Sequence, residues 1–176
     1  MSTTDPWRNP RLTSNLGEAP HHVPRKNMVL AWIRLWWPAL LWAAVIFGAS
    51  TDAFSSERTS RFIDPVLRWL FPSASQDSIF CMHHLVRKAA HFVEYFVFFV
   101  LLYRGIRRSR PGWHWSWAFA AWFIAALYSA LDEFHQTFIA SRGPSAWDCL
   151  LDSTGALVAL FTVFFLYRRF QRARAS

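Results

Sequence analysis

Acidic residues are scarce in this chain of 176 residues, which holds 11 of them against 19 lysines and arginines. Nine of the 11 lie between Asp52 and Asp152, so the two ends of the chain carry almost none. An excess of positive charge is one mark of a nucleic-acid-binding protein. Here, however, the arginines stand beside apolar stretches, where they anchor helix ends and attract anionic lipid. We therefore expect the lipid bilayer as a partner and no nucleic acid.

Cysteines and cofactor motifs are also few. The only two cysteines are Cys81 and Cys149. Sequence does not show whether they meet, so we interpret them as unpaired thiols, with a disulfide as the alternative in an oxidising compartment. No nucleotide, flavin or haem motif is present, and the sequence identifies no cofactor. No cleavable signal peptide is expected, because a long polar leader precedes the first apolar run.

Apolar residues, by contrast, are abundant: 53% of the chain is hydrophobic, with 17 Phe and 11 Trp. They form four stretches, each about the ~20 residues that a membrane helix needs. These predict spans at about residues 35–51, 85–103, 111–132 and 146–167. Pro38 should fall in the first turn of its span, where proline is tolerated. Asp64 and Pro65 predict the start of a short helix, about 64–71, that lies in the outer interface.

The charges sort between the segments that these spans separate. Three segments (the residues before the first span, the second connection and the C-terminal tail) hold 13 basic residues and two acids. The other two connections and the adjoining helix ends hold six basic residues and nine acids. This is the positive-inside pattern. We predict an all-α integral membrane protein with four transmembrane helices and cytoplasmic N- and C-termini. Its parts would be a disordered basic leader (1–27), a membrane domain (28–170) and a basic tail (171–176).

The second predicted span is unusually polar on one side. At 100° per residue, one arc of the helix holds six polar side chains: His84, Arg87, Lys88, His91, Glu94 and Tyr95. Glu94 lies about 9 Å below Lys88 along the helix. A lone charge at that depth costs on the order of several kcal/mol, so Glu94 must be protonated, paired or beside a wet cavity. We interpret the arc as a functional pocket. The alternative for Arg87 and Lys88 is that their long side chains only extend their charges to the membrane interface.

Polar residues also gather at the end of the third span and at the start of the fourth. Asp132, Glu133 and Gln136 share half of one helix, and Arg142 follows in a tight outer turn.

In the fourth span, Ser145 and Asp148 have the spacing of a capping box, which is the structural alternative for Asp148. That box leaves Asp152, one turn deeper, unexplained. Gly155 and Ala159 continue the same face with the small-residue spacing that lets another helix approach closely.

Two of these stretches resemble motifs of the VanZ-like family of bacterial integral membrane proteins. Residues 87–96, RKAAHFVEYF, are similar to its R-K-x-x-H-F-x-E-Y motif, and DEFHQTF at 132–138, with Arg142 and Asp148, is similar to D-E-x-x-Q-x-F…R-x…D. The resemblance covers about residues 36–165 and implies a multi-pass protein of the bacterial plasma membrane. It departs at residues 49–52, ASTD in place of a Ser-Ser-Gln type of ending, which argues against a first-span contribution to the site. Asp152 stands where the family often has Asn. A role in glycopeptide resistance would be analogy only.

We therefore expect a polar site at the outer ends of spans two to four, which binds or processes an anionic cell-envelope ligand such as a lipid-linked precursor. The candidates for acid–base chemistry are His91, Glu94, Glu133 and Asp148. The candidates for ligand binding are Lys88, Asp132, Gln136, Arg142 and Asp152. Whether the site catalyses a reaction is left open by the sequence.

Two alternatives stay open. The same charges would also serve as a paired network that fixes helix packing in a non-enzymatic protein. A metal-dependent hydrolase is the other, because His91-x-x-Glu94 and Asp132-x-x-His135 have ligand-like spacing. The neighbouring basic residues would repel a divalent cation, so we expect no metal. A channel is not expected, since no span is polar along its whole length.

Overall fold

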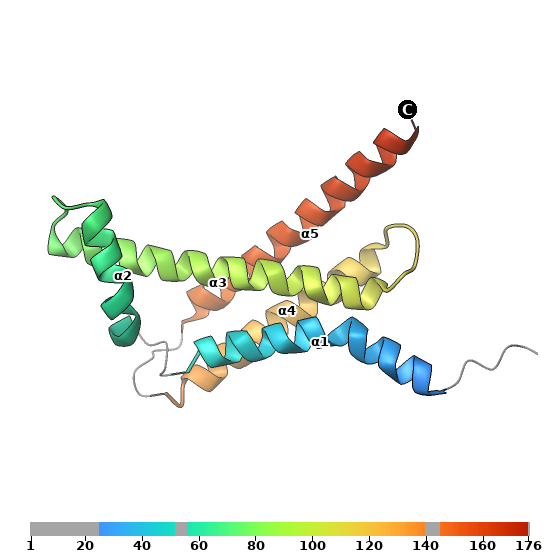
Figure 1. Cartoon of the computed structure of the whole chain (residues 1–176), viewed down its shortest axis with the longest axis horizontal. Helices are drawn as coiled ribbons and strands as arrows, with labels where there is room; N and C mark the ends of the chain where they lie inside the picture. The colour runs from blue at the N-terminus through green and yellow to red at the C-terminus, as the bar shows by residue number, and fades with distance from the viewer. Residues whose placement is uncertain (1–24, 52–55, 140–144, 176) are drawn as a thin grey trace, which may run out of the picture. The chain divides into compact units, whose positions relative to one another are not determined.

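The computed structural model describes residues 25–51, 56–139 and 145–175, and these form five α-helices and no strand (Figure 1). The predicted all-α class is confirmed for this part of the chain. The contacts described below lie within the unit Arg34–Ser176. The helices are α1 (Arg25–Ala49), α2 (Ser56–Leu70), α3 (Gln76–Arg107), α4 (Trp115–Gln136) and α5 (Ala146–Ala175).

Several helix ends differ from the predicted boundaries. Because α1 begins at Arg25, Pro38 lies inside the helix rather than in its first turn. The missing N–H of Pro38 leaves the carbonyl four residues earlier without its helical donor. α5 continues to Ala175, so the predicted C-terminal tail is helical almost to its end. The predicted leader lies outside the described residues up to position 24.

Helix α2 begins at Ser56 and contains Pro65, so the predicted helix start at Asp64 is wrong. The reason is a tertiary contact that sequence does not reveal. His83 of α3 pairs through Nδ1 with Asp64 Oδ1 at 3.0 Å, and its Nε2 lies 3.2 Å from Thr59 Oγ1. Asp64 therefore binds another helix instead of capping its own, and the turn around Thr59 is held against α3.

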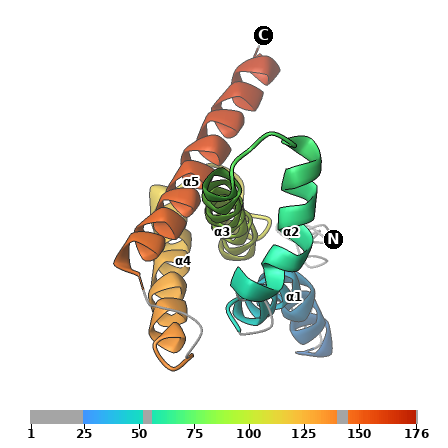
Figure 2. The same ribbon diagram turned by 90° about the vertical axis from the view of Figure 1, so that its left-hand side faces the viewer.

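Helix α3 is the centre of the packing and contacts α2, α4 and α5 (Figure 2). It begins at Gln76 rather than near Leu85, after Ser75, whose side chain accepts a hydrogen bond from Ser78 N at 3.2 Å. Its buried aromatic side chains face small residues of the two neighbouring helices. The buried set comprises Tyr95, Phe98, Phe99 and Tyr103 of α3, Ala118, Ala121 and Ala125 of α4, and Ala156 and Ala159 of α5.

Helices α3 and α5 approach each other closely at Gly155. A Cβ atom placed on Gly155 would lie 2.4 Å from the backbone oxygen of Phe92. Ala159, one turn further along α5, is fully buried. The expectation that these two small residues let another helix approach closely is confirmed, and α3 is that helix.

Aromatic side chains link helices by donating hydrogen bonds to backbone carbonyls. Trp42 Nε1 of α1 donates to Glu94 O of α3 at 2.9 Å, and the Tyr128 hydroxyl of α4 donates to Ala43 O of α1 at 2.7 Å. Trp122 Nε1 of α4 donates likewise to the Ser153 carbonyl of α5 at 3.1 Å. Such interhelical bonds stabilise helix pairs where apolar surroundings offer no competing water. They attach α1, which makes few close backbone contacts, to the rest of the bundle.

We expect Tyr128→Phe to destabilise the attachment of α1 by about 0.6–1 kcal/mol, because it removes one interhelical hydrogen bond and keeps the ring. The melting temperature of the detergent-purified protein measures the effect. Tyr167→Phe is the matched control, because the described residues give the Tyr167 hydroxyl no hydrogen-bond partner. An equal melting temperature for the two variants would contradict a role for this bond.

The surface of the bundle is largely apolar. Along α4, four large side chains at intervals of one turn are exposed: Phe119, Phe123, Leu127 and Leu131. Two of the described helices, Val29–Ala49 and Ala146–Ala175, are long and apolar enough to cross a membrane. Together these features indicate a protein that belongs in a membrane.

Candidate functional site

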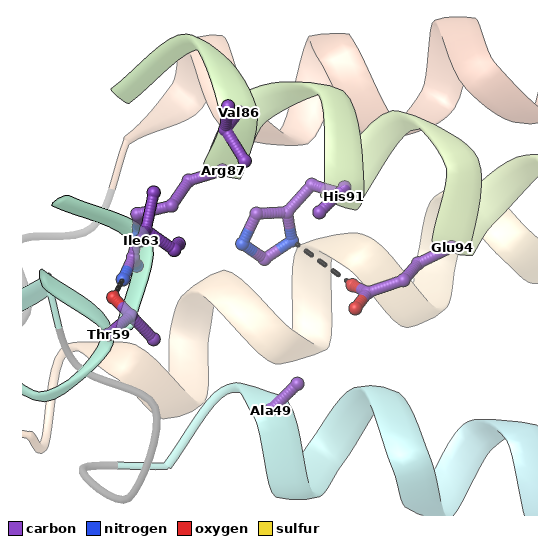
Figure 3. A pocket seen from close by; sticks show the side chains of 8 residues that line it. Ala49, Thr59, Ile63, Val86, Arg87, His91 and Glu94 are labelled. Carbon is purple, nitrogen blue, oxygen red and sulfur yellow. Dashed lines mark hydrogen bonds and ion pairs between the residues drawn. The ribbon is translucent and has the colours of Figure 1, made fainter. Parts of the chain in front are cut away.

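A cavity of about 140 Å³ lies where the end of α1 meets α2 and α3 (Figure 3). It is lined by Ala49, Thr59, Ile63, Val86, Arg87, Ala90, His91 and Glu94. His91 and Glu94 point from α3 into this space, with Ala49 of α1 on its other side. Their ring nitrogen Nδ1 and carboxylate Oε2 are 3.5 Å apart. The predicted arc of α3 thus places a histidine–carboxylate pair in a cavity.

Arg87 forms another wall of the cavity. Its guanidinium extends towards α2 and donates to Thr59 Oγ1 at 3.3 Å. Thr59 also contacts His83, so a chain of polar contacts joins α2 to α3 beside the cavity. The cavity therefore combines the permanent cation of Arg87 with the His91–Glu94 pair.

Lys88, the neighbour of Arg87, points elsewhere. Its ammonium donates to Asp148 Oδ1 of α5 at 2.7 Å, and both side chains are largely exposed. An exposed ion pair of this kind contributes about 0–1 kcal/mol. Asp148 is therefore the counter-charge of Lys88, and an anionic ligand at Lys88 would have to displace it.

A second polar group is buried between α1, α4 and α5. Asp132 Oδ2 accepts hydrogen bonds from Ser50 Oγ at 2.5 Å and from Gln136 Nε2 at 3.0 Å. Asp152 Oδ2 accepts from Ser129 Oγ at 2.8 Å. All of these side chains are buried, with Asp132 5% and Asp152 2% exposed. The two predicted carboxylates thus join three helices rather than facing solvent.

This buried group retains unused hydrogen-bonding capacity. Within the described part of the chain, Asp132 Oδ1 and Asp152 Oδ1 have no hydrogen-bond partner. Tyr95 is fully buried, and its hydroxyl lies within electrostatic range of both carboxylates. Buried polar atoms without a partner cost free energy, and protein cores hold few of them.

The cavity and the buried group adjoin along the chain. Ala49 lines the cavity while Ser50 bonds to Asp132, and Glu94 lines the cavity while Tyr95 lies in the buried group. A ligand in the cavity would therefore contact the turns of α1 and α3 that carry Ser50 and Tyr95.

Glu133, a candidate for acid–base chemistry, forms a hydrogen bond at the start of α5. Its Oε2 accepts a hydrogen bond from Ser145 N at 2.7 Å, immediately before α5. In a capping box, the Asp148 carboxylate would accept the hydrogen bond from this N–H. Instead Asp148 pairs with Lys88, and Glu133 of α4 accepts the hydrogen bond from the Ser145 N–H at the start of α5. Glu133 is therefore engaged at the start of α5, and it is not among the residues that line the cavity.

Sequence reasoning missed Ser50, Ser129 and the buried position of Tyr95. The argument against a first-span contribution is wrong, because Ser50 donates the shortest hydrogen bond to Asp132. Helical spacing held a usable signal for Ser129, which lies one turn before Asp132 on α4. Tyr95 was visible in the motif RKAAHFVEYF, but its burial depends on α4 and α5 packing over it.

The sequence analysis also named Arg142, the two cysteines and a possible metal site. Arg142 lies outside the described residues. Cys81 and Cys149 are free thiols, as interpreted from the sequence. Among the described residues, no three His, Cys, Asp or Glu side chains form a group suited to a metal. The His135 ring packs against Phe47 with ring centroids 4.8 Å apart, whereas Asp132 faces Ser50, so the Asp132-x-x-His135 spacing does not produce a joint site.

These features define an all-helical protein with apolar outer faces whose polar side chains come from five helices. The family model described as VanZ/LLP1 matches residues 35–168, and the chain therefore belongs to this family. The resemblance seen in the two motifs is thereby confirmed. No curated protein and no solved structure matches the chain.

Proposed function

We propose that the chain is a four-span protein of the bacterial plasma membrane with both termini in the cytoplasm. Membership of the VanZ/LLP1 family, the two apolar helices α1 and α5 and the exposed apolar stripe of α4 support this arrangement. The distribution of arginines supports the orientation. Under this topology, the cavity between α1, α2 and α3 lies on the extracytoplasmic side.

We infer that this cavity binds the anionic group of a lipid-linked ligand of the cell envelope. The observation that carries the inference is the placement of Arg87, His91 and Glu94 on the wall of one cavity. A volume of about 140 Å³ suits a phosphate-sized group rather than a whole lipid. The exposed apolar side chains of the bundle would leave the ligand's hydrocarbon part in the bilayer.

Each polar side chain has a distinct role in this proposal. Arg87 supplies charge and paired N–H donors for an oxyanion. His91, held by Glu94, takes up or releases a proton at the bound group. Lys88 contributes a second positive charge once Asp148 releases it. The buried Asp132 and Asp152 keep α1, α4 and α5 in register around the cavity.

A structural protein is the second candidate. It is favoured by the burial of Asp132, Gln136 and Asp152, whose bonds run between side chains rather than towards the cavity. In that case the polar cluster fixes helix packing and the protein acts through a partner.

The two candidates differ in a ligand-binding measurement. The melting temperature of the purified protein would be followed with polyprenyl phosphates, lipid-linked wall precursors, divalent metals and chelator. One of the anionic lipids should raise the melting temperature of the wild-type protein. Arg87→Gln and Lys88→Ala should weaken binding by about tenfold or more, since each loses a charge-assisted contact of about 1.5–3 kcal/mol.

Arg61→Gln is the matched control, because Arg61 is exposed on α2 and outside the cavity lining. It removes the same charge and should leave ligand binding unchanged. Unaltered binding in both Arg87→Gln and Lys88→Ala would refute the ligand site. A shift that chelator abolishes would favour the metal-dependent alternative.

A further inference from the structure

A second charged region lies away from the cavity, at the C-terminal ends of α3 and α5. Residues 95–131 and 153–176 contain no acidic residue. They contain eight arginines: Arg104, Arg107, Arg108, Arg110, Arg168, Arg169, Arg172 and Arg174. Within the described ranges, none of the eight forms an ion pair. The region therefore holds a concentrated positive charge with no partner in this part of the protein.

An aromatic cluster holds the two arginine-bearing segments together. Trp113, in the turn after α3, has its ring centroid 5.2 Å from that of Tyr103 in α3 and 5.2 Å from that of Phe164 in α5. Tyr167 of α5 lies 6.1 Å from the same ring. The turn after α3 thus lies against Phe164 and Tyr167 of α5, at the point where the arginines of α5 begin.

From this point, α5 carries a groove of about 460 Å³ whose lining residues all belong to this one helix: Phe164, Phe165, Arg168, Arg169 and Arg172. Phe161 and Phe165 are exposed one turn apart, and Arg168 and Arg172 continue the same helix face. The face is therefore apolar for one turn and then basic for the next. Arg168 also lies over the Phe164 ring at 5.9 Å, which orients its guanidinium.

We propose that this groove binds the headgroup phosphate of an anionic membrane phospholipid, with an acyl chain against Phe161 and Phe165. Guanidinium groups bind phosphate through paired N–H donors, and clustered arginines beside an apolar helix attract anionic lipid. The change from phenylalanine to arginine along one face matches the change from acyl chain to phosphate in a lipid. The site is separate from the cavity of the proposed function and does not depend on it.

Nucleic acid would also be attracted by eight arginines, but it does not fit the apolar half of the groove. Exposed phenylalanines that precede the arginines on a long apolar helix are suited to hydrocarbon. A free phosphate ion would use the arginines alone. These two ligands therefore serve as discriminating arms of the experiment.

The test measures the melting temperature of the full-length purified protein during titration with phosphatidylglycerol, and separately with phosphatidylcholine of the same acyl chains. Of the two lipids, only phosphatidylglycerol should give a saturable rise in melting temperature. The variant Arg168→Gln/Arg169→Gln/Arg172→Gln should bind it about 100-fold more weakly, because each basic residue contributes roughly fivefold. Arg172→Gln alone, a milder change in an exposed side chain, should weaken binding about fivefold.

The matched control is Arg58→Gln/Arg61→Gln/Arg68→Gln, which removes the same charge from exposed positions of α2. It should retain the phosphatidylglycerol response of wild type. An unchanged response in the groove variants, or an equal response to phosphatidylcholine, would overturn the proposal. So would a rise of the same size with inorganic phosphate alone, or a rise with single-stranded RNA that the groove variants lose.

Discussion

Replacing Gly155 by alanine is expected to reduce the stability of the folded protein by about 3 kcal/mol, at the upper end for overpacking. The added Cβ would stand 2.4 Å from the backbone oxygen of Phe92. Real contacts do not become that short, and neither partner is a flexible side-chain end. Helices α3 and α5 must therefore move apart. This contact lies in the same helix pair that buries Tyr95, Ala156 and Ala159, so the movement would also loosen the core.

Folded yield and melting temperature in detergent measure this effect. Gly48→Ala is the matched control: Gly48 lies in α1, and a Cβ there would meet no atom within 4 Å. Alanine in a helix is favoured over glycine by about 0.5–1 kcal/mol. The control should be neutral or slightly more stable. If Gly155→Ala melts at or above the wild-type temperature, the close α3–α5 crossing is refuted.

The second large effect is expected at Asp132. In Asp132→Ala the Ser50 hydroxyl and the Gln136 amide would each lose their acceptor in a buried site. Each unsatisfied buried group costs about 1–3 kcal/mol. We therefore expect a total loss of about 3 kcal/mol. Asp132→Asn keeps the shape and an oxygen that accepts both bonds, so it should retain most of the stability.

Asp148→Ala is the reference for the loss of a carboxylate at the surface, because Asp148 pairs with Lys88 in an exposed position. It should cost about 0–1 kcal/mol. The melting temperatures of Asp132→Ala, Asp132→Asn and Asp148→Ala show how much each substitution destabilises the protein. Equal values for Asp132→Ala and Asp148→Ala would show that the buried hydrogen bonds contribute little.

The Asp132→Asn variant also tests whether the buried carboxylate does more than position the helices. A structural network needs the hydrogen bonds and not the charge, so this variant should behave as wild type in every assay. If Asp132→Asn melts normally but responds differently to an anionic lipid, the buried carboxylate acts on the adjoining cavity. The turn of α1 that carries Ala49 and Ser50 is the physical link between them.

Much of the site was predictable because helical periodicity acts locally. The spacing of Arg87, His91 and Glu94 places them on one face of any helix, and the structure has them on one cavity wall. The small-residue spacing at Gly155 and Ala159 likewise predicted a close helix contact. The capping interpretation of Asp64, and the alternative capping interpretation of Asp148, failed for the opposite reason. Each has a spacing typical of a cap, yet each binds a basic side chain of α3 instead.

By itself, the sequence determined the helical class, the family and the polar faces, because hydrophobic pattern and motif residues depend only on neighbours along the chain. Only the tertiary structure decided which polar residues are buried and which are exposed. Asp132 and Asp148 are both acidic residues at predicted helix ends, but α1 covers the first while the second faces Lys88 at the surface. Burial and pairing depend on how separate helices pack, and residues as distant as Ser50 and Asp132 meet only then.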